Sequence, residues 1–260
     1  MARQTLRQSG TLVFGYMLSL LVVLAAWQYA SSRAIVPMLL PSPFNTLKVG
    51  AGLWESGQLL SDIEASVLRI AAGFAAGCAV GLPAGLLMGS FRPVRQAFEP
   101  FLHFLRFLPA LAWIPAAMMW LGTGEDAKIA LLAYATIFVV TLNTMAGVAA
   151  IPRNQIRAAH SFGATRGQIF LLVAVPATLS YVVAGMRLAM GNCFQTVVAA
   201  ELVASDSGLG FLIFSSRRFM QTEIAYVGIA VLGTIGILTD LLFQFATKRL
   251  LRQYVLQPNH

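Results

Sequence analysis

The sequence has little charge and almost no cysteine, and each shortage excludes a class of protein. Only 11% of the 260 residues are charged, against roughly 25% in soluble domains, whereas 58% are hydrophobic. No soluble fold of this length could bury that much apolar surface in one core. The two cysteines, Cys78 and Cys193, both stand in apolar runs, which excludes a disulfide framework of the secreted kind.

Motifs for metals and nucleotides are also missing. His103 and His160 have no partner at metal-ligand spacing, so the sequence predicts no metal site. None of the three lysines follows a glycine, and no glycine-rich loop ends in Gly-Lys-Ser or Gly-Lys-Thr. The chain therefore has no phosphate-binding loop of its own, and if ATP drives its activity, another polypeptide must bind the nucleotide.

What the sequence does have is a series of long uncharged runs, several of which reach the roughly 20 residues that cross a bilayer as a helix. We predict an all-α polytopic membrane protein, a single domain over 1–260. The six predicted spans are about 11–30, 62–90, 101–121, 128–149, 177–203 and 223–246. Ser61 and Glu64 are expected to form a capping box at the start of the second span, and Ser42 to cap a short helix over about 43–54.

Arginines and lysines gather at the span ends, where they orient a membrane protein rather than bind nucleic acid. With the N-terminus inside, ten of them face the cytoplasm: Arg3, Arg7, Arg92, Arg95, Arg153, Arg157, Arg166, Lys248, Arg249 and Arg252. Five lie on the opposite side: Arg33, Lys48, Lys128, Arg217 and Arg218. Both termini are therefore predicted to be cytoplasmic. A cleaved signal peptide over the first span is the alternative, which its length and the even span count disfavour.

Glycine recurs at every fourth position of the second span. The five are Gly73, Gly77, Gly81, Gly85 and Gly89. Glycines at this spacing form a smooth groove that another helix can approach closely. The groove drifts around an ideal helix and could serve two neighbours. We favour packing within one subunit, with a dimer seam or a moving surface as the alternative.

Residues that break or charge the spans are candidates for a solute pathway. In the third span, Arg106, Pro109 and Trp113 fit either a broken helix that lines a pathway or a simple kink with Arg106 reaching the headgroups. Asn143 in the fourth span could line a path, although such residues more often bond between helices. In the fifth span, Arg187 and Glu201 share one helix face, and both are expected to face the bundle interior or a wet cavity.

A polar, basic stretch over 152–176 separates the fourth and fifth spans. Pro152 and Gly163 predict a helix over 153–162, and Pro176 predicts a break before the fifth span, so that 164–175 lies along the inner interface. Arg153 and Arg157 share one side of the short helix, and an apolar stripe covers the other. Because so short a helix is marginal alone, it must pack either on the protein's own inner face or in a partner's groove.

This stretch resembles a cytoplasmic motif in the membrane subunits of binding-protein-dependent ABC importers: Glu-Ala-Ala, three residues, Gly, nine residues, then Ile-x-Leu-Pro. The chain has the same spacing in Ala158-Ala159, Gly163 and Val173-Ala-Val175-Pro176. Arg157 stands where the motif has Glu, and valines replace Ile and Leu. The segments LPSP at 40–43, LAWIP at 111–115 and AAELVASDSGLGFLI at 199–213 are similar to the nitrate, sulfonate and taurine branch of these permeases.

The resemblance implies a permease subunit of the bacterial inner membrane that is not itself an enzyme. Two copies would form the pathway within the lipid bilayer, two ATPase subunits would bind ATP and Mg, and an extracytoplasmic solute-binding protein would deliver the solute. The residues implied in coupling to the ATPase are Arg153, Arg157, Ala158, Ala159, Gly163 and Pro176. A small anion, taurine-like or sulfonate-like first and otherwise nitrate or bicarbonate, would cross by alternating access, with Arg187 offering a positive charge.

Two other classes of protein remain as alternatives. An ion-coupled secondary transporter would need acidic groups deep in the membrane and two mirrored halves, which the chain does not plainly show. An intramembrane enzyme would need a nucleophile and base, or a metal cluster, at useful spacing, and the sequence has neither.

Overall fold

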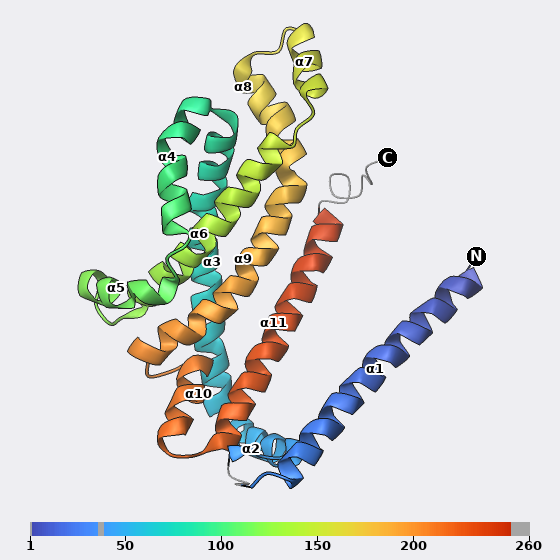
Figure 1. Cartoon of the computed structure of the whole chain (residues 1–260), viewed down its shortest axis with the longest axis vertical. Helices are drawn as coiled ribbons and strands as arrows, with labels where there is room; N and C mark the ends of the chain where they lie inside the picture. The colour runs from blue at the N-terminus through green and yellow to red at the C-terminus, as the bar shows by residue number, and fades with distance from the viewer. Residues whose placement is uncertain (1, 36–38, 251–260) are drawn as a thin grey trace. The chain divides into compact units, whose positions relative to one another are not determined.

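The computed structural model describes residues 2–35 and 39–250, and every regular element in that part is helical (Figure 1). The elements are α1 (Ala2–Ser32), α2 (Pro43–Glu55), α3 (Gln58–Ser90), α4 (Arg92–Leu105), η2 (Ala110–Trp113), α5 (Ile114–Leu121), α6 (Glu125–Ala149), α7 (Arg153–Ser161), α8 (Arg166–Ile169), η3 (Phe170–Ala174), α9 (Val175–Ala204), α10 (Leu209–Arg218) and α11 (Thr222–Leu250).

Four helices among the described residues are long and apolar enough to cross a membrane: Gln58–Ser90, Glu125–Ala149, Arg166–Leu202 and Thr222–Arg249. A bent pair, α4 with η2 and α5, qualifies as a fifth if it is counted as one span, and Met17–Ser32 in α1 is apolar but shorter. The all-α membrane class is therefore confirmed, and the number of six spans stays a prediction.

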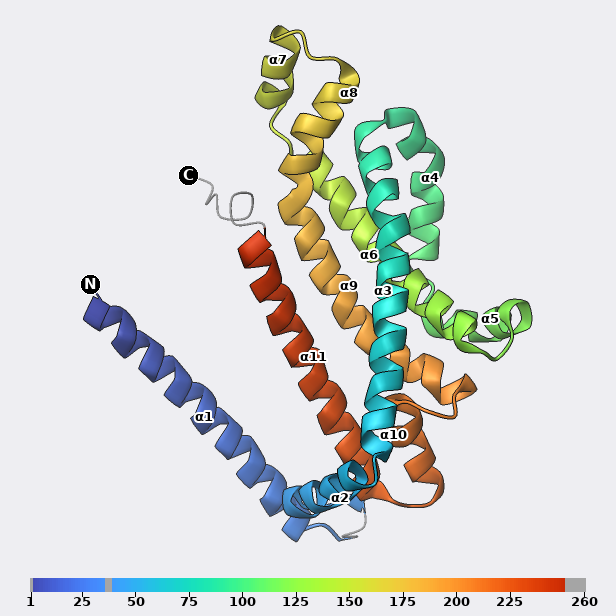
Figure 2. The same ribbon diagram turned by 180° about the vertical axis from the view of Figure 1, so that it is seen from behind.

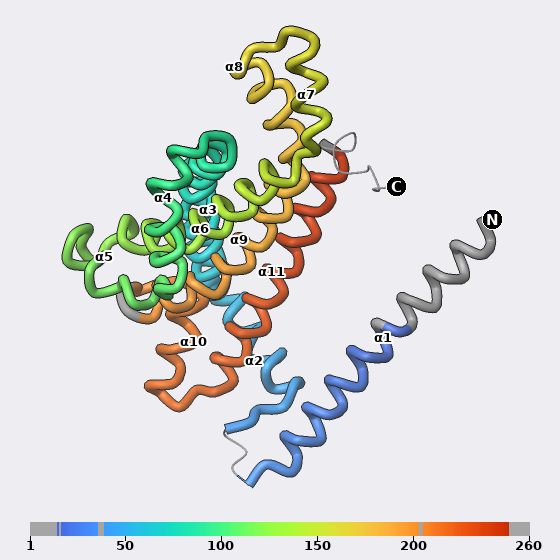
Figure 3. Tube along the Cα trace, turned by 45° about the horizontal axis from the view of Figure 1, so that its top comes forward, coloured from blue at the N-terminus to red at the C-terminus, as the bar shows by residue number. Residues whose placement is uncertain are grey.

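The predicted span over 101–121 is not one helix. The chain bends by 90° between α4 and the following η2 and α5, a turn that can be followed in Figure 3. Pro109 has no N–H to continue a helix and disfavours helical backbone at Leu108. The hydroxyl of Tyr134 lies 2.7 Å from the carbonyl oxygen of Leu105 and 3.2 Å from that of Leu108. The break thus has a polar partner for its carbonyls, which makes it a broken helix rather than a kink.

The predicted break at Pro176 is wrong. A continuous helical run extends from Arg166 to Leu202 through α8, η3 and α9. The turn before Pro176 is π-helical, and the N–H of Val175 donates to the carbonyl of Phe170. Because a π-turn already shifts the hydrogen-bond ladder, a residue without an N–H is accommodated there at little cost. Residues 166–175, which the sequence predicts to lie along the inner interface, therefore belong to the same helical run as α9.

The starts of α2 and α3 test two predicted caps. The side chain of Ser42 accepts a backbone hydrogen bond in the first turn of α2, as predicted. The capping box of Ser61 and Glu64 is wrong, because α3 already begins at Gln58 and Ser61 lies inside it. Gly57, with φ at 77°, directly precedes the helix, in a conformation that favours glycine.

The chain divides into two compact units. The first comprises 1–60 and 212–230, and the second comprises 61–211 and 231–260. In the first unit, Trp27 stacks on Tyr226 with the ring centroids 5.6 Å apart, and its indole N–H donates to the carbonyl of Pro41 at 3.0 Å. Gly50 in α2 lies against Val227. These contacts give the first unit a small core of its own.

The second unit is built around α3, α6 and α9, which lie side by side in both Figure 1 and Figure 2. All five glycines of the α3 groove face α6, which repeats its contact residues at the same four-residue spacing. The residues they meet there are Leu132, Thr136, Val140, Thr144 and Val148. A methyl group on Gly77 or Gly85 would overlap Thr136 or Thr144. Matched rows of this kind pack ridge into groove, so one neighbour, within the same subunit, takes the whole groove.

Candidate functional site

The segment over 152–176 forms α7, a tight turn and α8 at one end of the second unit (Figure 1, Figure 2). Gly163 ends α7 with φ at 77°, the left-handed backbone that glycine adopts without strain. Thr165 and Gln168 form a capping box that begins α8. Because both helix ends are defined by local hydrogen bonds, the angle between α7 and α8 is set by the turn itself.

Helix α7 has two different faces. Ile156 and Ala159 are half-buried on one face, and Ile156 lines a cavity of about 440 Å³ together with Phe170 and Val173, so a gap lies between this face and the rest of the chain. The opposite face is open to solvent, and its exposed residues include Arg153, Arg157 and Ala158. At the end of the helix the side chain of Phe162 is 91% exposed. No residue of α7 is buried, and the surface on which this helix packs stays a prediction.

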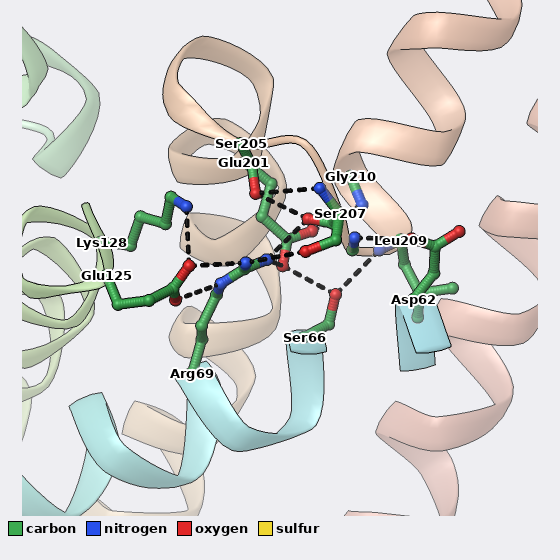
Figure 4. Close-up of polar contacts among 11 residues, drawn as sticks. Asp62, Ser66, Arg69, Glu125, Lys128, Glu201, Ser205, Ser207, Leu209 and Gly210 are labelled. Carbon is green, nitrogen blue, oxygen red and sulfur yellow. Dashed lines mark hydrogen bonds and ion pairs between the residues drawn. The ribbon is translucent and has the colours of Figure 1, made fainter. Parts of the chain in front are cut away.

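Glu201, a predicted pathway residue, lies in a closed ionic network near the C-terminal end of α9 (Figure 4). Its carboxylate has no exposed area. Three groups donate to it: the guanidinium of Arg69 at 2.8 Å, the hydroxyl of Ser66 at 2.7 Å and the backbone N–H of Gly210 at 2.7 Å. A carboxylate so enclosed has no exposed surface for a solute to reach, and its surroundings indicate that it holds helices together.

Arg69 is the centre of that network. Its guanidinium also donates to both oxygens of Glu125, at 2.6 and 2.8 Å, and to the carbonyl of Ser207 at 2.7 Å. Lys128 donates to Glu125 at 2.8 Å, so two cations face two anions and the group is neutral. Such balance is what makes charges tolerable inside an apolar fold. The network joins α3, α6 and α9 to the segment between α9 and α10.

Gly208 shows how tightly that segment is bound. Its N–H donates to the carboxylate of Asp62 at 2.7 Å, and a methyl group added to it would overlap the carboxylate of Glu201. Its φ of 115° is also a conformation that L side chains rarely adopt. Glycine is therefore required at this position for two separate reasons.

Arg187 lies elsewhere on α9 and has a different partner. It donates to both oxygens of Asp240 in α11, at 2.5 and 2.8 Å, and Gln244 donates to the same carboxylate at 2.8 Å. The three residues line a cavity of about 770 Å³. Its other polar lining residues include Ser180, Asn192, Gln195, Thr247 and Lys248. The two charged residues of α9 therefore have different surroundings. Arg187 lies beside an open cavity, and Glu201 is buried.

Another cavity, of about 390 Å³, lies at the break before Pro109. Arg106, Pro109 and Tyr134 line it from one side, and Asn192 and Gln195 from the other. Because Asn192 and Gln195 also line the cavity at Arg187, one polar stretch of α9 connects the two. Three predicted pathway residues therefore lie near the same stretch of α9. Arg106 and Pro109 line one cavity beside it, and Arg187 lines the other.

Two other predicted pathway residues lie outside these cavities. Trp113 packs on the rings of Trp120 and Tyr134, with centroids 6.5 and 5.8 Å away. Asn143 donates to the carbonyl of Val139 in its own helix at 2.8 Å and lies against Gly185 of α9. Both contribute to helix packing in this structure.

Sequence reasoning missed the partners of the charged residues. Arg69 and Asp240 lie inside the predicted spans 62–90 and 223–246, but no sequence pattern says which charge either of them meets. A signal was present, because a charge inside an apolar span requires a counter-charge. The spans contain several acids and several arginines, however, and helical spacing alone does not say which of them meet.

Comparison with known proteins assigns the chain to a family. The description "binding-protein-dependent transport system inner membrane component" belongs to a family model that matches residues 81–252. A probable ABC transporter permease of Brucella melitensis is 36% identical over 234 residues, which cover 90% of this chain and 94% of the relative. The taurine transport system permease of Escherichia coli is 34% identical over 253 residues, 95% and 91% of the two chains. The nitrate import permease of Synechocystis is 28% identical over 233 residues, 86% and 84% of the two chains.

A solved structure shares the fold. The inward facing MetNI methionine ABC transporter matches with a TM-score of 0.65 at 20% sequence identity, over 76% of this chain and 96% of that one. At this identity the likeness speaks for the fold alone. The family match and the relatives carry the assignment further. The chain therefore belongs to the family of binding-protein-dependent transport system inner membrane components.

Proposed function

We propose that the chain forms the membrane pathway of an ATP-driven importer for a small sulfonate-like anion. Two copies enclose the pathway, two separate ATPase subunits bind ATP and Mg and dock on α7, and an extracytoplasmic binding protein delivers the solute. The observation that carries this proposal is the exposed helix α7, which has no buried residue and presents Arg153, Arg157 and the 91% exposed Phe162 to a partner. Such a helix fits a partner's groove.

The continuous helix after Gly163 supplies the link between docking and transport. Because α8, η3 and α9 form one run, a push on α7 by a closing ATPase is transmitted along it to Asn192 and Gln195 at the two cavities. The π-helical turn at 170–174 is where this run yields most easily, since its hydrogen-bond geometry is already distorted. Alternating access then follows from movement of α9.

The proposed solute is an anion because basic side chains outnumber acidic ones at the two cavities beside α9, where Lys248 adds to the arginines and Asp240 is the acid. Arg106 lines the smaller one and Arg187 the larger. The relatives named for taurine, aliphatic sulfonates and nitrate handle solutes with an anionic group in common. With α7 at the cytoplasmic side of a bacterial inner membrane, both termini are cytoplasmic, as the basic residues predict.

The ion-coupled alternative loses support from the same contacts. It needs an acid deep in the membrane that is free to take a proton or sodium ion. Within the described residues, two of the acids inside the predicted spans are bound by arginines, Glu201 by Arg69 and Asp240 by Arg187.

Co-purification tests the proposal. A tagged chain, expressed with the ATPase encoded for the same transporter, should recover that subunit in mild detergent. Phe162→Asp should lower the recovery at least tenfold, because a charge replaces the exposed aromatic end of α7. Phe219→Asp is the matched control, since Phe219 is an aromatic 73% exposed on another part of the chain, and it should change nothing. Failure to recover any ATPase, or equal recovery by the two variants, would contradict docking on α7.

A further inference from the structure

An arginine and an aspartate meet far from the ends of two apolar helices. Arg187 precedes Leu202 by fifteen residues, about 22 Å along α9, and Asp240 lies well inside α11. Two N–H groups of the guanidinium face the two carboxylate oxygens, at 2.5 and 2.8 Å. This parallel, bidentate arrangement gives the strongest hydrogen bonds that two side chains form.

The pair is not covered by its own chain. The side chain of Arg187 is 49% exposed and that of Asp240 is 38% exposed. Charges that face lipid are strongly unfavourable, so this surface faces water or polar protein. The cavity beside it is also lined by amide and hydroxyl groups, among them Asn192, Gln195 and Thr247. Its volume, about 770 Å³, is that of a small-molecule site.

The buried pair of the same chain shows what a purely structural arrangement looks like. Glu201 has no exposure and is held by Arg69 and by two neutral donors. Arg187 differs, because an arginine has five N–H donors and only two of them have a hydrogen-bond partner among the described residues. Asp240, in contrast, accepts three hydrogen bonds, two from Arg187 and one from Gln244. The cation therefore retains free donors beside a cavity, and the anion is fixed in front of it.

We propose that Asp240 is an internal anion that occupies Arg187 when the pathway is empty, and that the anionic group of the solute displaces it there. This inference rests on the proposed import of anions and deepens it. The guanidinium pairs with one anion at a time, and the tethered carboxylate stays nearby as an added negative charge while the solute is bound. Gln244, one turn along α11, holds the displaced carboxylate close enough to return. Asp240 is then the residue that keeps solute affinity low and release fast.

The physical reason is the requirement for release. A guanidinium with no counter-ion in a partly dehydrated cavity holds a sulfonate through charge-assisted, bidentate hydrogen bonds. A transport site must bind well enough for the solute to enter and weakly enough for it to leave. Competition by a tethered carboxylate lowers the affinity for every anion, whatever else the solute carries.

The experiment uses the complex of the chain with its ATPase subunits. Asp240→Asn keeps the shape of the side chain and its contact with Gln244 but removes the competing charge. Calorimetric binding of methanesulfonate, taurine and nitrate to the complex without binding protein should become about tenfold tighter in this variant. Uptake into liposomes that contain the binding protein should have a lower maximal rate. Adding Arg187→Gln to Asp240→Asn should remove the tighter binding.

Glu99→Gln is the matched control. It removes the acid from another exposed pair, Arg95–Glu99 at 3.0 Å on α4, and should change neither binding nor uptake. Unchanged or weaker binding by Asp240→Asn overturns the inference. Weaker binding of taurine with unchanged binding of methanesulfonate also overturns it, because Asp240 would then contact the solute's amino group directly. If the wild type shows no ATP-dependent uptake of any of the three anions, the proposed function fails and this inference fails with it. If the wild type takes them up and Asp240→Asn behaves like Glu99→Gln, only this inference fails.

Discussion

Replacing Arg69 by methionine removes the only cation bonded to Glu201 among the described residues. The carboxylate of Glu201 has no exposed area, so water cannot replace the lost partner, and Ser66 and Gly210 supply only neutral donors. Removing one partner of a buried ion pair costs about 3–5 kcal/mol. The second contact of Arg69, with Glu125, adds less than about 1 kcal/mol, because the side chain of Glu125 is 54% exposed.

The measurement is the thermal unfolding of the purified protein in detergent, followed by circular dichroism. For a chain of this size a loss of about 3–5 kcal/mol corresponds to a fall in Tm of roughly 6–20 °C. Glu99→Gln is the control, because it removes the acid of the exposed pair Arg95–Glu99, and it should lower Tm by less than about 4 °C. The double variant Arg69→Met with Glu201→Met should recover most of the loss, because an apolar pair of similar volume replaces a buried ion pair without an orphan charge.

Two results would refute this reasoning. If Arg69→Met is no less stable than Glu99→Gln, Glu201 is not buried in the way the network implies. If the effects of Arg69→Met and Glu201→Met simply add in the double variant, the two side chains are not energetically coupled.

Three further predictions concern packing and the projecting segment. Gly77→Ala should lower the free energy of unfolding by about 1–3 kcal/mol, because the added methyl overlaps Thr136. The control, Gly191→Ala at an open helical position, should be neutral or stabilise by up to about 1 kcal/mol. Equal Tm values for the two variants would contradict the close approach of α3 and α6. Tyr134→Phe should cost about 1–2 kcal/mol, seen as a lower Tm, because it leaves carbonyls at the break before α5 without their donor; an unchanged Tm would mean that water serves them equally well. Gly163→Val should lower ATPase recovery and solute-stimulated ATP hydrolysis with little change in Tm, because a β-branched residue disfavours φ at 77° in an exposed turn; normal coupling would show that the turn geometry is dispensable.

Local rules were sufficient where a residue acts through its own backbone. Ser42 caps α2, and Gly163 ends α7 at the positions their chemistry predicts. The long uncharged runs determine an all-helical membrane protein, because a backbone in lipid must satisfy its own hydrogen bonds. Local rules failed at Pro176, where a π-turn absorbed a residue that normally ends a helix, and at Ser61, where α3 began a turn earlier than its capping pattern indicated.

The sequence by itself determined the class of the protein, its glycine row and the motif that reveals its family, because each of these depends on spacing along one helix or on composition. Only the tertiary structure decided the pairing of charges: Arg69 with Glu201, and Arg187 with Asp240. Partners separated by 53 or 132 residues meet because α3, α9 and α11 are placed by the packing of whole helices. Helical spacing says which face a charge occupies, and the helix it meets there depends on how that face is covered. A sequence that shows several arginines and acids inside its spans therefore leaves open which pair is buried and which stands beside a cavity.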